Sequence, residues 1–452
     1  MEKKTARVLF AGTNSGCGKT TVTCAVLQAL VNRKLKVGAF KCGPDYIDPM
    51  FHSRIIGAKS GNLDLFFLGE NTLKYLFAKN SKGCDVSIVE GVMGYYDGLG
   101  IASTESSTYE VARVTETPVI LIVNARGASL SVLAQIKGFT DFRADSGIRG
   151  VILNSCTKST YDVLAPEIER YFGGKIKPLG FMPVVKECSL ESRHLGLVTA
   201  AEVKDLKEKM NVLAGKAMEC IDIDGIIGLA KAAPDLSYDA AEPKRFEEPV
   251  RIGIARDKAF CFYYGDSLDA LKEMGAELVS FSPLEDKALP EGLDGLYLGG
   301  GYPELYKKEL SENKGMLASV KSAVSGGMPC IAECGGFMYL LENIEGIPMA
   351  RALPGGSQNT GKLQRFGYVT ITAEKDNMLC KKGESIRAHE FHHYDADNPG
   401  SDFTAEKSTG KCWQAAIATD TLYAGFPHFH FYSNLSFAES FYRACLKRRK
   451  DV

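Results

Sequence analysis

Short apolar runs of strand length recur along the first half of the chain, and each is followed by a loop or by a helix-like segment. These runs lie at residues 8–11, 37–40, 86–89, 119–123 and 150–153. Strands that are apolar on both faces are typical of parallel sheets that helices cover on both sides, because neither face meets water. We therefore expect an α/β domain with a parallel sheet.

A second series of apolar runs predicts a second α/β domain. It lies at 251–255, 277–281, 295–298 and 329–332. Residues 435–448 predict a closing helix whose basic C-terminal end suits the helix dipole. Residues 232–250 mix prolines with charges and break the pattern, which indicates a linker. The 452-residue chain is thus expected to contain two α/β domains, 1–231 and 251–452.

Composition excludes several classes of protein. The 54 basic side chains balance 55 acidic ones, and no long Lys/Arg run suggests nucleic-acid binding. The longest apolar runs, such as 118–123, are far too short for a membrane span. Residues 1–4 are charged and precede only a short apolar stretch, so we expect no signal peptide. Thirteen cysteines stand singly without a CxxC motif, which favours reduced thiols in a cytoplasmic protein.

A glycine-rich loop, 12–21, follows the first apolar strand and precedes an apolar helical segment. Glycines let backbone N–H groups surround phosphates, while Lys19 reaches the outer phosphates and Thr20 can bind Mg²⁺. The loop is one residue longer than the common form and resembles that of dethiobiotin synthetase. It implies ATP chemistry without identifying the phosphoryl acceptor. The predicted nucleotide-binding residues are Gly12, Thr13, Gly16, Gly18, Lys19, Thr20 and Thr21.

Acidic residues after later strands are candidates for the metal. Glu90 ends the run at 86–89 and is expected to hold Mg²⁺ with Thr20, and Asp97 is a second candidate. After the second strand, Asp45 and Asp48 lie in a turn made rigid by prolines and a glycine. That turn could bind Mg²⁺ or orient a polar substrate. Alternatively, the two aspartates are local caps, and the pattern alone favours neither.

A candidate nucleophile lies in the second domain, where residues 328–341 indicate a strand, an abrupt turn and a helix. Cys334 stands at the turn, so we expect the helix N-terminus to depress its pKa and favour the thiolate. Cys330, inside the strand, fits a buried core residue. The glycine-rich stretch 298–304 could supply backbone N–H groups for an oxyanion hole together with Gly335.

Histidines follow Cys334 in two groups, His389/His392/His393 and His428/His430. No cysteine or carboxylate spacing completes a tetrahedral zinc set with either group. A thiolate nucleophile needs a base, and we expect one histidine of the later group to serve. The remaining histidines are expected to be structural or to face the substrate.

Taken together, these motifs resemble the cobyrinate a,c-diamide synthase family, which are glutamine-dependent ATP ligases of cobalamin synthesis. The turn at 43–49 is specific, because the related cobyric acid synthases look different there. One departure is Asn124, where we expect an aspartate. The resemblance is carried by residues 12–21, 41–49, 90–98, 193–197, 259–264, 298–305, 333–336, 389–392 and 428–431.

The resemblance implies a P-loop NTPase domain of dethiobiotin-synthetase type followed by a class I glutamine amidotransferase-like domain. With Mg²⁺, ATP and glutamine, such an enzyme converts the a and c carboxylates of a corrinoid, cobyrinate, to carboxamides. ATP forms an acyl phosphate, and glutamine hydrolysis supplies ammonia. A homodimer is an open possibility. The residues assigned to substrate or metal are Lys41, Asp45, Tyr46, Asp48 and Asp97, with Thr20 and Glu90 for Mg²⁺.

The resemblance also implies roles in the second domain. Cys334 would be the nucleophile and His428 its base, with His430 as the alternative base. Class I amidotransferases usually carry a glutamate two residues after the catalytic histidine, and here that position is His430. We therefore expect a Cys–His dyad. The oxyanion hole is assigned to Gly300, Gly301 and Gly335.

Two other functions remain open. The same reaction could act on hydrogenobyrinate or nickel-sirohydrochlorin, since the amidated edge is the same. The chain could also be a P-loop switch ATPase of the partitioning type with a binding module. That class usually has an additional lysine early in its loop, whereas residues 13–17 contain none. Cys334 with its glycines also argues for chemistry, and glutaminase activity would discriminate.

Overall fold

The computed structural model describes residues 1–188 and 206–451. The chain divides into two compact units, Met1–Ala241 and Glu242–Val452. The boundaries expected at 231 and 251 lie on either side of this division, and we keep them as a proposal. No helix within the described residues is both long and apolar enough to cross a membrane.

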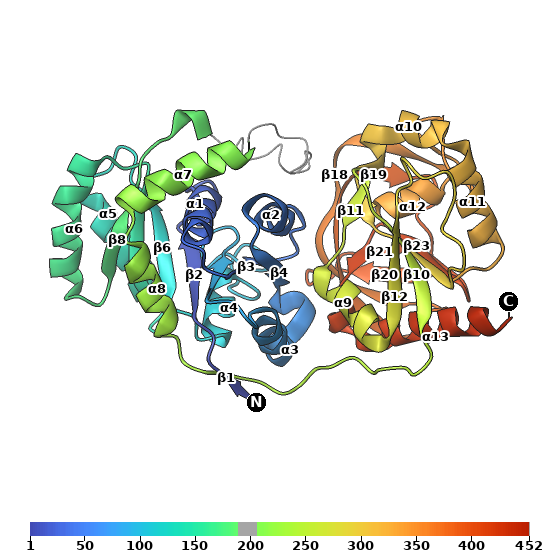
Figure 1. The fold of residues 1–452 in the computed structure, drawn as a ribbon, viewed down its shortest axis with the longest axis horizontal. Coiled ribbons are helices and arrows are strands. Elements are labelled where there is room, and N and C mark those ends of the chain that lie inside the picture. The colour runs from blue at the N-terminus through green and yellow to red at the C-terminus, as the bar shows by residue number, and fades with distance from the viewer. Residues whose placement is uncertain (189–205, 452) are drawn as a thin grey trace. The chain divides into compact units, whose positions relative to one another are not determined.

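A seven-stranded parallel sheet forms the centre of the first unit, in the order β4-β3-β5-β2-β6-β7-β8 (Figure 1). Its strands are β2 (Arg7–Gly12), β3 (Val37–Cys42), β4 (Lys59–Leu63), β5 (Val86–Glu90), β6 (Val119–Asn124), β7 (Ile148–Asn154) and β8 (Lys177–Met182). The five strands expected from apolar runs are confirmed. The two edge strands, β4 and β8, were not predicted, because edge strands need not be apolar on both faces. Strand β2 lies between β5 and β6, so its carboxyl end is at a topological switch point, where α/β sheets bind ligands.

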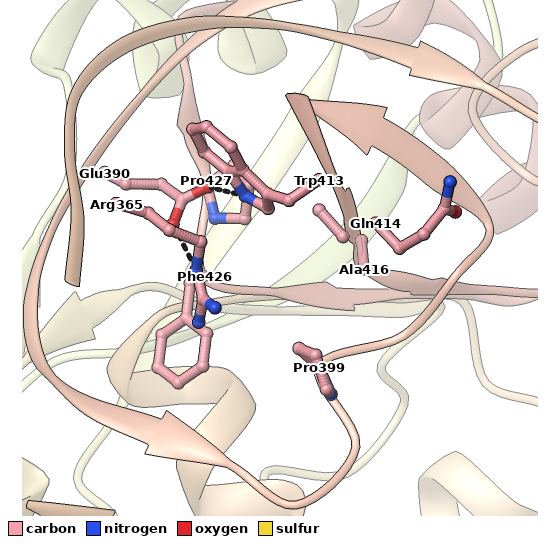
Figure 2. A pocket seen from close by; sticks show the side chains of 9 residues that line it. Arg365, Glu390, Pro399, Trp413, Gln414, Ala416, Phe426 and Pro427 are labelled. Atoms are coloured by element: carbon pink, nitrogen blue, oxygen red, sulfur yellow. Dashed lines mark hydrogen bonds and ion pairs between the residues drawn. The ribbon is translucent and has the colours of Figure 1, made fainter. Parts of the chain in front are cut away.

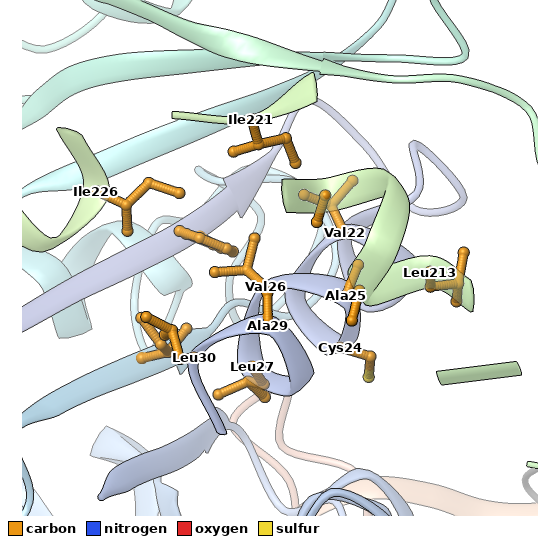
Figure 3. Packing of buried hydrophobic residues seen from close by; sticks show 14 of the residues in the cluster. Val22, Cys24, Ala25, Val26, Leu27, Ala29, Leu30, Leu213, Ile221 and Ile226 are labelled. Carbon is orange, nitrogen blue, oxygen red and sulfur yellow. The ribbon is translucent and has the colours of Figure 1, made fainter. Parts of the chain in front are cut away.

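Helices follow most strands of this sheet. They are α1 (Lys19–Asn32), α2 (Ile47–Phe51), the π-helix η1 (His52–Ile56), α3 (Leu65–Asn80), α4 (Thr108–Val114), α5 (Ser131–Asp141), α6 (Lys158–Phe172), the 3-10 helix η2 (Lys186–Cys188), α7 (Leu206–Cys220) and α8 (Ile223–Lys231). Helix α1 is apolar on nearly every side because the sheet and α7 both pack against it, and α8 packs on the same sheet. Figure 3 shows Val26 and Leu30 of α1 near Ile226 of α8, and Ala25 near Leu213 of α7. Each fully buried Val or Leu stabilises this layer by about 1.5–3 kcal/mol.

The segment just after α8 packs on the first unit. Strand β9 (Leu236–Ser237) pairs antiparallel with β1 (Glu2–Lys3). The buried guanidinium of Arg7 donates to the carbonyl of Pro234 at 2.8 Å and to that of Thr115 at 2.7 Å. The beginning of the expected linker, 232–250, is therefore held against the sheet by backbone bonds and by a buried arginine.

The second unit has a six-stranded sheet in the order β12-β10-β13-β15-β23-β22, parallel except for β22. Its strands are β10 (Val250–Ala255), β12 (Ala276–Phe281), β13 (Gly295–Leu298), β15 (Cys330–Glu333), β22 (Ile417–Ala418) and β23 (Leu422–Gly425). The helices are α9 (Gly265–Met274), η3 (Pro303–Tyr306), α10 (Lys307–Glu312), α11 (Lys314–Ser325), α12 (Gly335–Leu340), η4 (Phe431–Ser433) and α13 (Leu435–Asp451). The expected strands and the closing helix are confirmed.

A second, largely antiparallel sheet covers one face of the parallel sheet. Its strands are β16 (Asn343–Ile344), β17 (Ile347–Pro348), β18 (Gly356–Ala373), β19 (Ser385–Ala396), β20 (Phe403–Glu406), β21 (Cys412–Ala415) and β24 (His428–Phe429), and a small pair is formed by β11 (Phe260–Phe262) and β14 (Gly300–Gly301). Along β15 the side chains alternate. Ile331 packs with β18, β19 and α13, whereas Cys330 and Ala332 pack with α11 and α12.

Candidate active sites

The phosphate loop connects β2 to α1, and its backbone requires glycine at two positions. Gly16 has φ +79° and Gly18 has φ +95°, conformations that other residues adopt only with strain. A Cβ on Gly18 would also lie 2.0 Å from Nδ2 of Asn154. That amide donates to the carbonyl of Cys17 at 2.9 Å, so the end of β7 holds the loop. Asn154 lies outside every sequence motif described above, so its contact with the loop is visible only in the fold.

Lys19 begins α1 and folds back over the loop. Its ammonium donates to the carbonyl of Asn14 at 3.1 Å and to that of Met93. Burial lowers the pKa of this ammonium. Met93 follows β5 and has φ +51°, so strained backbone lies beside the lysine. Lys19 and the N-terminus of α1 together provide a positive site for phosphate.

A buried network centred on Glu90 lies next to the loop. Oε1 of Glu90 accepts from the hydroxyl of Thr20 at 2.7 Å and from Nζ of Lys41 at 2.8 Å. Nε2 of His52 lies 3.2 Å from the other oxygen, Oε2. Lys41 also pairs with Asp48 at 2.6 Å. The structure thus brings Thr20, Lys41, Asp48 and Glu90 together, and it adds His52.

The charges in this network are set by burial and by Lys41. Burial alone would raise the pKa of Glu90, but the neighbouring Lys41 ammonium and the bond from His52 hold that pKa well below its usual range. Burial would lower the pKa of Lys41, yet Asp48 and Glu90 keep it well above its ordinary value. Burial raises the pKa of Asp48 to about 6, although Lys41 opposes the shift. Glu90 and Lys41 are therefore an ion pair at neutral pH.

Oxygen atoms of Thr20 and Glu90 fit a magnesium ion. The described residues contain no group of three His, Cys, Asp or Glu side chains able to hold a metal. Mg²⁺ does not require such a group, because it usually keeps waters and substrate phosphates and takes one or two protein oxygens. A hydroxyl and a carboxylate that meet beside a phosphate loop match this requirement.

The remaining acidic candidates shape loops. Oδ1 of Asp45 accepts from the N–H groups of Ile47 at 2.7 Å and Asp48 at 3.2 Å, as a local cap does. Oδ2 of Asp97 accepts from the N–H of Gly94 at 2.8 Å. Asp45 is therefore a local cap, which was one of the two alternatives for this turn. Asp48 instead pairs with Lys41. Tyr46 precedes the first residue of α2.

Asn124 and Thr108 make hydrogen bonds that shape the turns after strands β6 and β5. Asn124 ends β6, is exposed, and accepts from the N–H of Arg126 at 3.1 Å. Thr108, which the sequence analysis did not identify, exchanges hydrogen bonds with the backbone of Val92 and so fixes the turn after β5. Residues 193–197 lie outside the described part of the chain.

In the second unit, Cys334 stands between β15 and α12 with φ +49° and ψ −100°. This is a strained conformation for a non-glycine residue, and strain of this kind occurs at active sites. The next turn is packed tightly, because a Cβ on Gly336 would lie 2.0 Å from the carbonyl oxygen of Leu298. The strand–turn–helix arrangement expected around Cys334 is present.

The expected depression of the thiol pKa is wrong for this structure. Burial raises the pKa of Cys334, and the nearby carboxylate of Glu304 adds to the shift. Burial also raises the pKa of Glu304, to about 7. These surroundings favour the neutral thiol of Cys334 over the thiolate.

The proposed oxyanion glycines and His428 lie around this turn. A Cβ on Gly335 would be 3.1 Å from the amide nitrogen of Gly301. A Cβ on Gly300 would be 2.4 Å from Cε1 of His428, so only glycine leaves space for the imidazole. Gly335 directly follows Cys334, and the structure thus brings all five residues together.

His430 has different surroundings. Its Nδ1 accepts from the N–H of Tyr432 at 3.2 Å and caps η4, and its ring contacts Tyr264 at 5.0 Å between centroids. Burial lowers the pKa of His430 to about 3. This geometry favours His428 over His430 as the base.

Of the earlier histidine group, His392 belongs to a buried network around Glu390. Figure 2 shows Glu390 of this network with Arg365, Trp413 and Phe426. Oε1 of Glu390 accepts from the indole of Trp413 at 3.1 Å, and Oε2 lies 2.8 Å from Nε2 of His392 and 3.5 Å from Nε of Arg365. The His392 ring stacks on Phe426 at 4.0 Å. Phe426 follows Gly425, whose carbonyl accepts from the N–H of Cys334, so this network supports the turn.

The two units and their sites define a class: an ATP-binding P-loop domain joined to a glutamine amidotransferase domain. Residues 8–198 match the CobQ/CobB/MinD/ParA nucleotide binding domain, and residues 251–435 match the CobB/CobQ-like glutamine amidotransferase domain. The class is therefore a glutamine-dependent carbon–nitrogen ligase with ATP and glutamine as cosubstrates.

Similar curated proteins specify the family. The chain is 40% identical to the cobyrinate a,c-diamide synthase of Clostridium acetobutylicum, over 96% of this chain and 99% of the relative. It is 41% identical to that of Caldanaerobacter subterraneus subsp. tengcongensis (97% and 98%) and 39% identical to that of Thermoplasma volcanium (99% of each). The chain belongs to the cobyrinate a,c-diamide synthase family.

Proposed function

We propose that the chain amidates the a and c carboxylates of cobyrinate, using ATP and glutamine. The observation that carries this proposal is the nearly full-length similarity to synthases of that name, together with both sites in one chain. We also propose that the enzyme acts in the cytoplasm on small molecules.

The first unit activates the carboxylate. A substrate carboxylate oxygen attacks the γ-phosphorus of ATP, the bond to the β,γ-bridging oxygen breaks, and an acyl phosphate and ADP form. Lys19 and the N–H groups at the start of α1 stabilise the negative charge on the transferred group. Thr20 and Glu90 would hold Mg²⁺, which when bound neutralises phosphate charge. Lys41 and His52 keep Glu90 ionised, and Asp48 holds Lys41 in place.

The second unit releases ammonia. Because the thiol is buried and neutral, the proton of Cys334 moves to His428 as sulfur attacks the glutamine carboxamide. N–H groups of Gly301 and Gly335 stabilise the oxyanion. The imidazolium then protonates the leaving nitrogen, ammonia departs, and water hydrolyses the thioester to glutamate. Ammonia attacks the acyl phosphate and displaces phosphate, which gives the carboxamide.

Mass spectrometry of cobyrinate incubated with ATP, Mg²⁺ and glutamine tests the reaction. Two successive products are expected, each with one hydroxyl replaced by an amino group. Parallel incubations with hydrogenobyrinate and nickel-sirohydrochlorin rank the alternative substrates. A chain that hydrolyses ATP without releasing glutamate would instead be a switch ATPase with a binding module.

A further inference from the structure

A buried carboxylate adjoins the nucleophile on the opposite face of its strand. Glu333 is the last residue of β15, directly before Cys334, and only 1% of its surface is exposed. Because side chains alternate along a strand, Glu333 shares the face of Ile331. That face is apolar and includes Tyr423 and Phe429. A carboxylate in such surroundings requires polar partners.

The partners of Glu333 connect it to His428. Oε1 accepts from the backbone N–H of Phe429 at 3.1 Å, and Oε2 accepts from the hydroxyl of Tyr297 at 3.0 Å. The same Oε2 lies 3.6 Å from Nδ1 of His428. The carboxylate is thus fixed by the backbone of the residue that follows the histidine, and it faces the ring.

Two other residues near His428, His389 and Gly300, carry no negative charge that could stabilise its ring. Across the strand pair from His428 stands His389, and burial, with His428 next, lowers the pKa of His389 to about 3. His389 is therefore neutral at working pH. Gly300 contributes no side chain. Neither of these two neighbours is an anion, whereas Glu333 presents a carboxylate oxygen 3.6 Å from Nδ1 of His428.

We propose that Glu333 is the positioning residue for His428 and takes the place of the glutamate that class I amidotransferases carry two residues after the histidine. Nδ1–H of His428 donates to Glu333, which directs Nε2 to the thiol proton. When the proton of Cys334 transfers to Nε2, the carboxylate stabilises the imidazolium and takes no proton itself. The separation of 3.6 Å shortens to a hydrogen bond when glutamine is bound, as is common for catalytic bonds. This inference rests on the proposed role of Cys334 as nucleophile.

The primary test is Glu333→Gln, which keeps the size and an oxygen acceptor for Phe429 but removes the charge. We expect glutaminase kcat to fall by about 10²–10⁴-fold, with KM for glutamine changed by less than about threefold. Synthesis from added ammonia should stay within about twofold of wild type. Glu333→Asp should recover part of the lost kcat. A Glu333→Gln variant with kcat within about threefold of wild type would overturn the inference.

A matched control is Glu390→Gln, which removes another buried carboxylate beside a histidine of the same unit. It faces His392 rather than His428, so kcat should fall less than about tenfold. An equal loss in both variants would show that any buried carboxylate there is needed and would overturn a specific role for Glu333. If Cys334→Ser retains glutaminase activity, Cys334 is not the nucleophile. That result would contradict the proposed function itself, whatever the Glu333 variants show.

If Glu333→Gln does not fold, the wild-type chain still decides the question. Nitrogen NMR of ¹⁵N-histidine-labelled full-length protein, with His428 assigned by His428→Gln, reports which ring nitrogen is protonated. We expect the neutral ring to carry its proton on Nδ1. A neutral ring protonated on Nε2 would overturn the inference.

Discussion

The hydroxyl of Thr20 donates a 2.7 Å hydrogen bond to the carboxylate of Glu90, and this bond joins the first turn of α1 to the end of β5. The two residues lie 70 positions apart in the sequence. A parallel sheet brings them together because the carboxyl ends of neighbouring strands meet at one edge. Acyl phosphate formation should depend on this junction.

Glu90→Gln should abolish synthesis from both glutamine and ammonia, because glutamine cannot balance Lys41 or bind Mg²⁺ as an anion. The first unit should also lose about 1–3 kcal/mol of unfolding free energy, since Lys41 keeps only Asp48. Initial rates with each nitrogen source, and labelling of Cys334 by a glutamine analogue, measure the effect. Asp85→Asn, just before β5, is the control and should keep synthesis within about twofold. Normal ammonia-dependent synthesis in Glu90→Gln would contradict the assignment.

Asn154→Ala should weaken ATP binding without removing catalysis, because the amide of Asn154 only holds the carbonyl of Cys17. Loss of one hydrogen bond predicts a KM for ATP raised by about 3- to 10-fold. Asn124→Ala provides a matched control, since Asn124 is paired with Asn154 in the sheet but accepts from Arg126. Equal changes in KM for the two variants would show that Asn154 has no particular role in the loop.

Arg7→Met should destabilise the first unit by about 2–3 kcal/mol, because the carbonyls of Thr115 and Pro234 lose a charged donor. Thermal and urea unfolding of the variant measure this. Arg33→Met is the control: its ion pair with Asp224 is largely exposed and should contribute at most about 1 kcal/mol. If both variants unfold like the wild type, the buried guanidinium does not hold the 232–241 segment.

The fold could largely be predicted from the sequence, because its central strands are apolar on both faces. The edge strand β4, Lys59–Leu63, reads Lys-Ser-Gly-Asn-Leu and has a single large apolar residue. Its sequence therefore does not show the apolar pattern that predicts a strand. The long β18–β19 hairpin was also missed, since its exposed part mixes polar and apolar residues without a clear period. In both cases tertiary pairing, rather than local pattern, decides the structure.

The candidate sites could be predicted only where residues lie close in sequence. The phosphate loop and the Cys334 turn are local motifs. The pairing of Glu333 with the backbone of Phe429 spans 96 positions, and only the fold brings these residues together. The thiol pKa was predicted wrongly because the helix terminus can be read from sequence, whereas burial of Cys334 cannot.

His430→Asn should change the acid stability of the second unit and spare glutamine hydrolysis. Burial lowers the pKa of His430 to about 3, from an ordinary value of 6.5. Between these values the unfolded chain binds a proton that the folded chain does not, so stability falls as pH falls from about 6.5 towards 3. Asparagine can accept from Tyr432 and does not titrate. The Tm difference, variant minus wild type, should therefore grow between pH 7 and pH 5. A difference independent of pH, or loss of glutaminase activity, would contradict this.

The most direct test of the two-site account is the nitrogen-source dependence of Cys334→Ser. A serine hydroxyl has a far higher pKa than a thiol, so it cannot be activated by His428 in the same way. Amidation by this variant should be measured with saturating glutamine, and then with ammonium at raised pH. Lys19→Ala serves as the opposite case, because it removes acyl phosphate formation and should fail with both donors. We predict that Cys334→Ser loses glutamine-dependent synthesis and keeps ammonia-dependent synthesis near the wild-type rate. A folded Cys334→Ser chain that is inactive with both donors, or fully active with glutamine, would contradict the account.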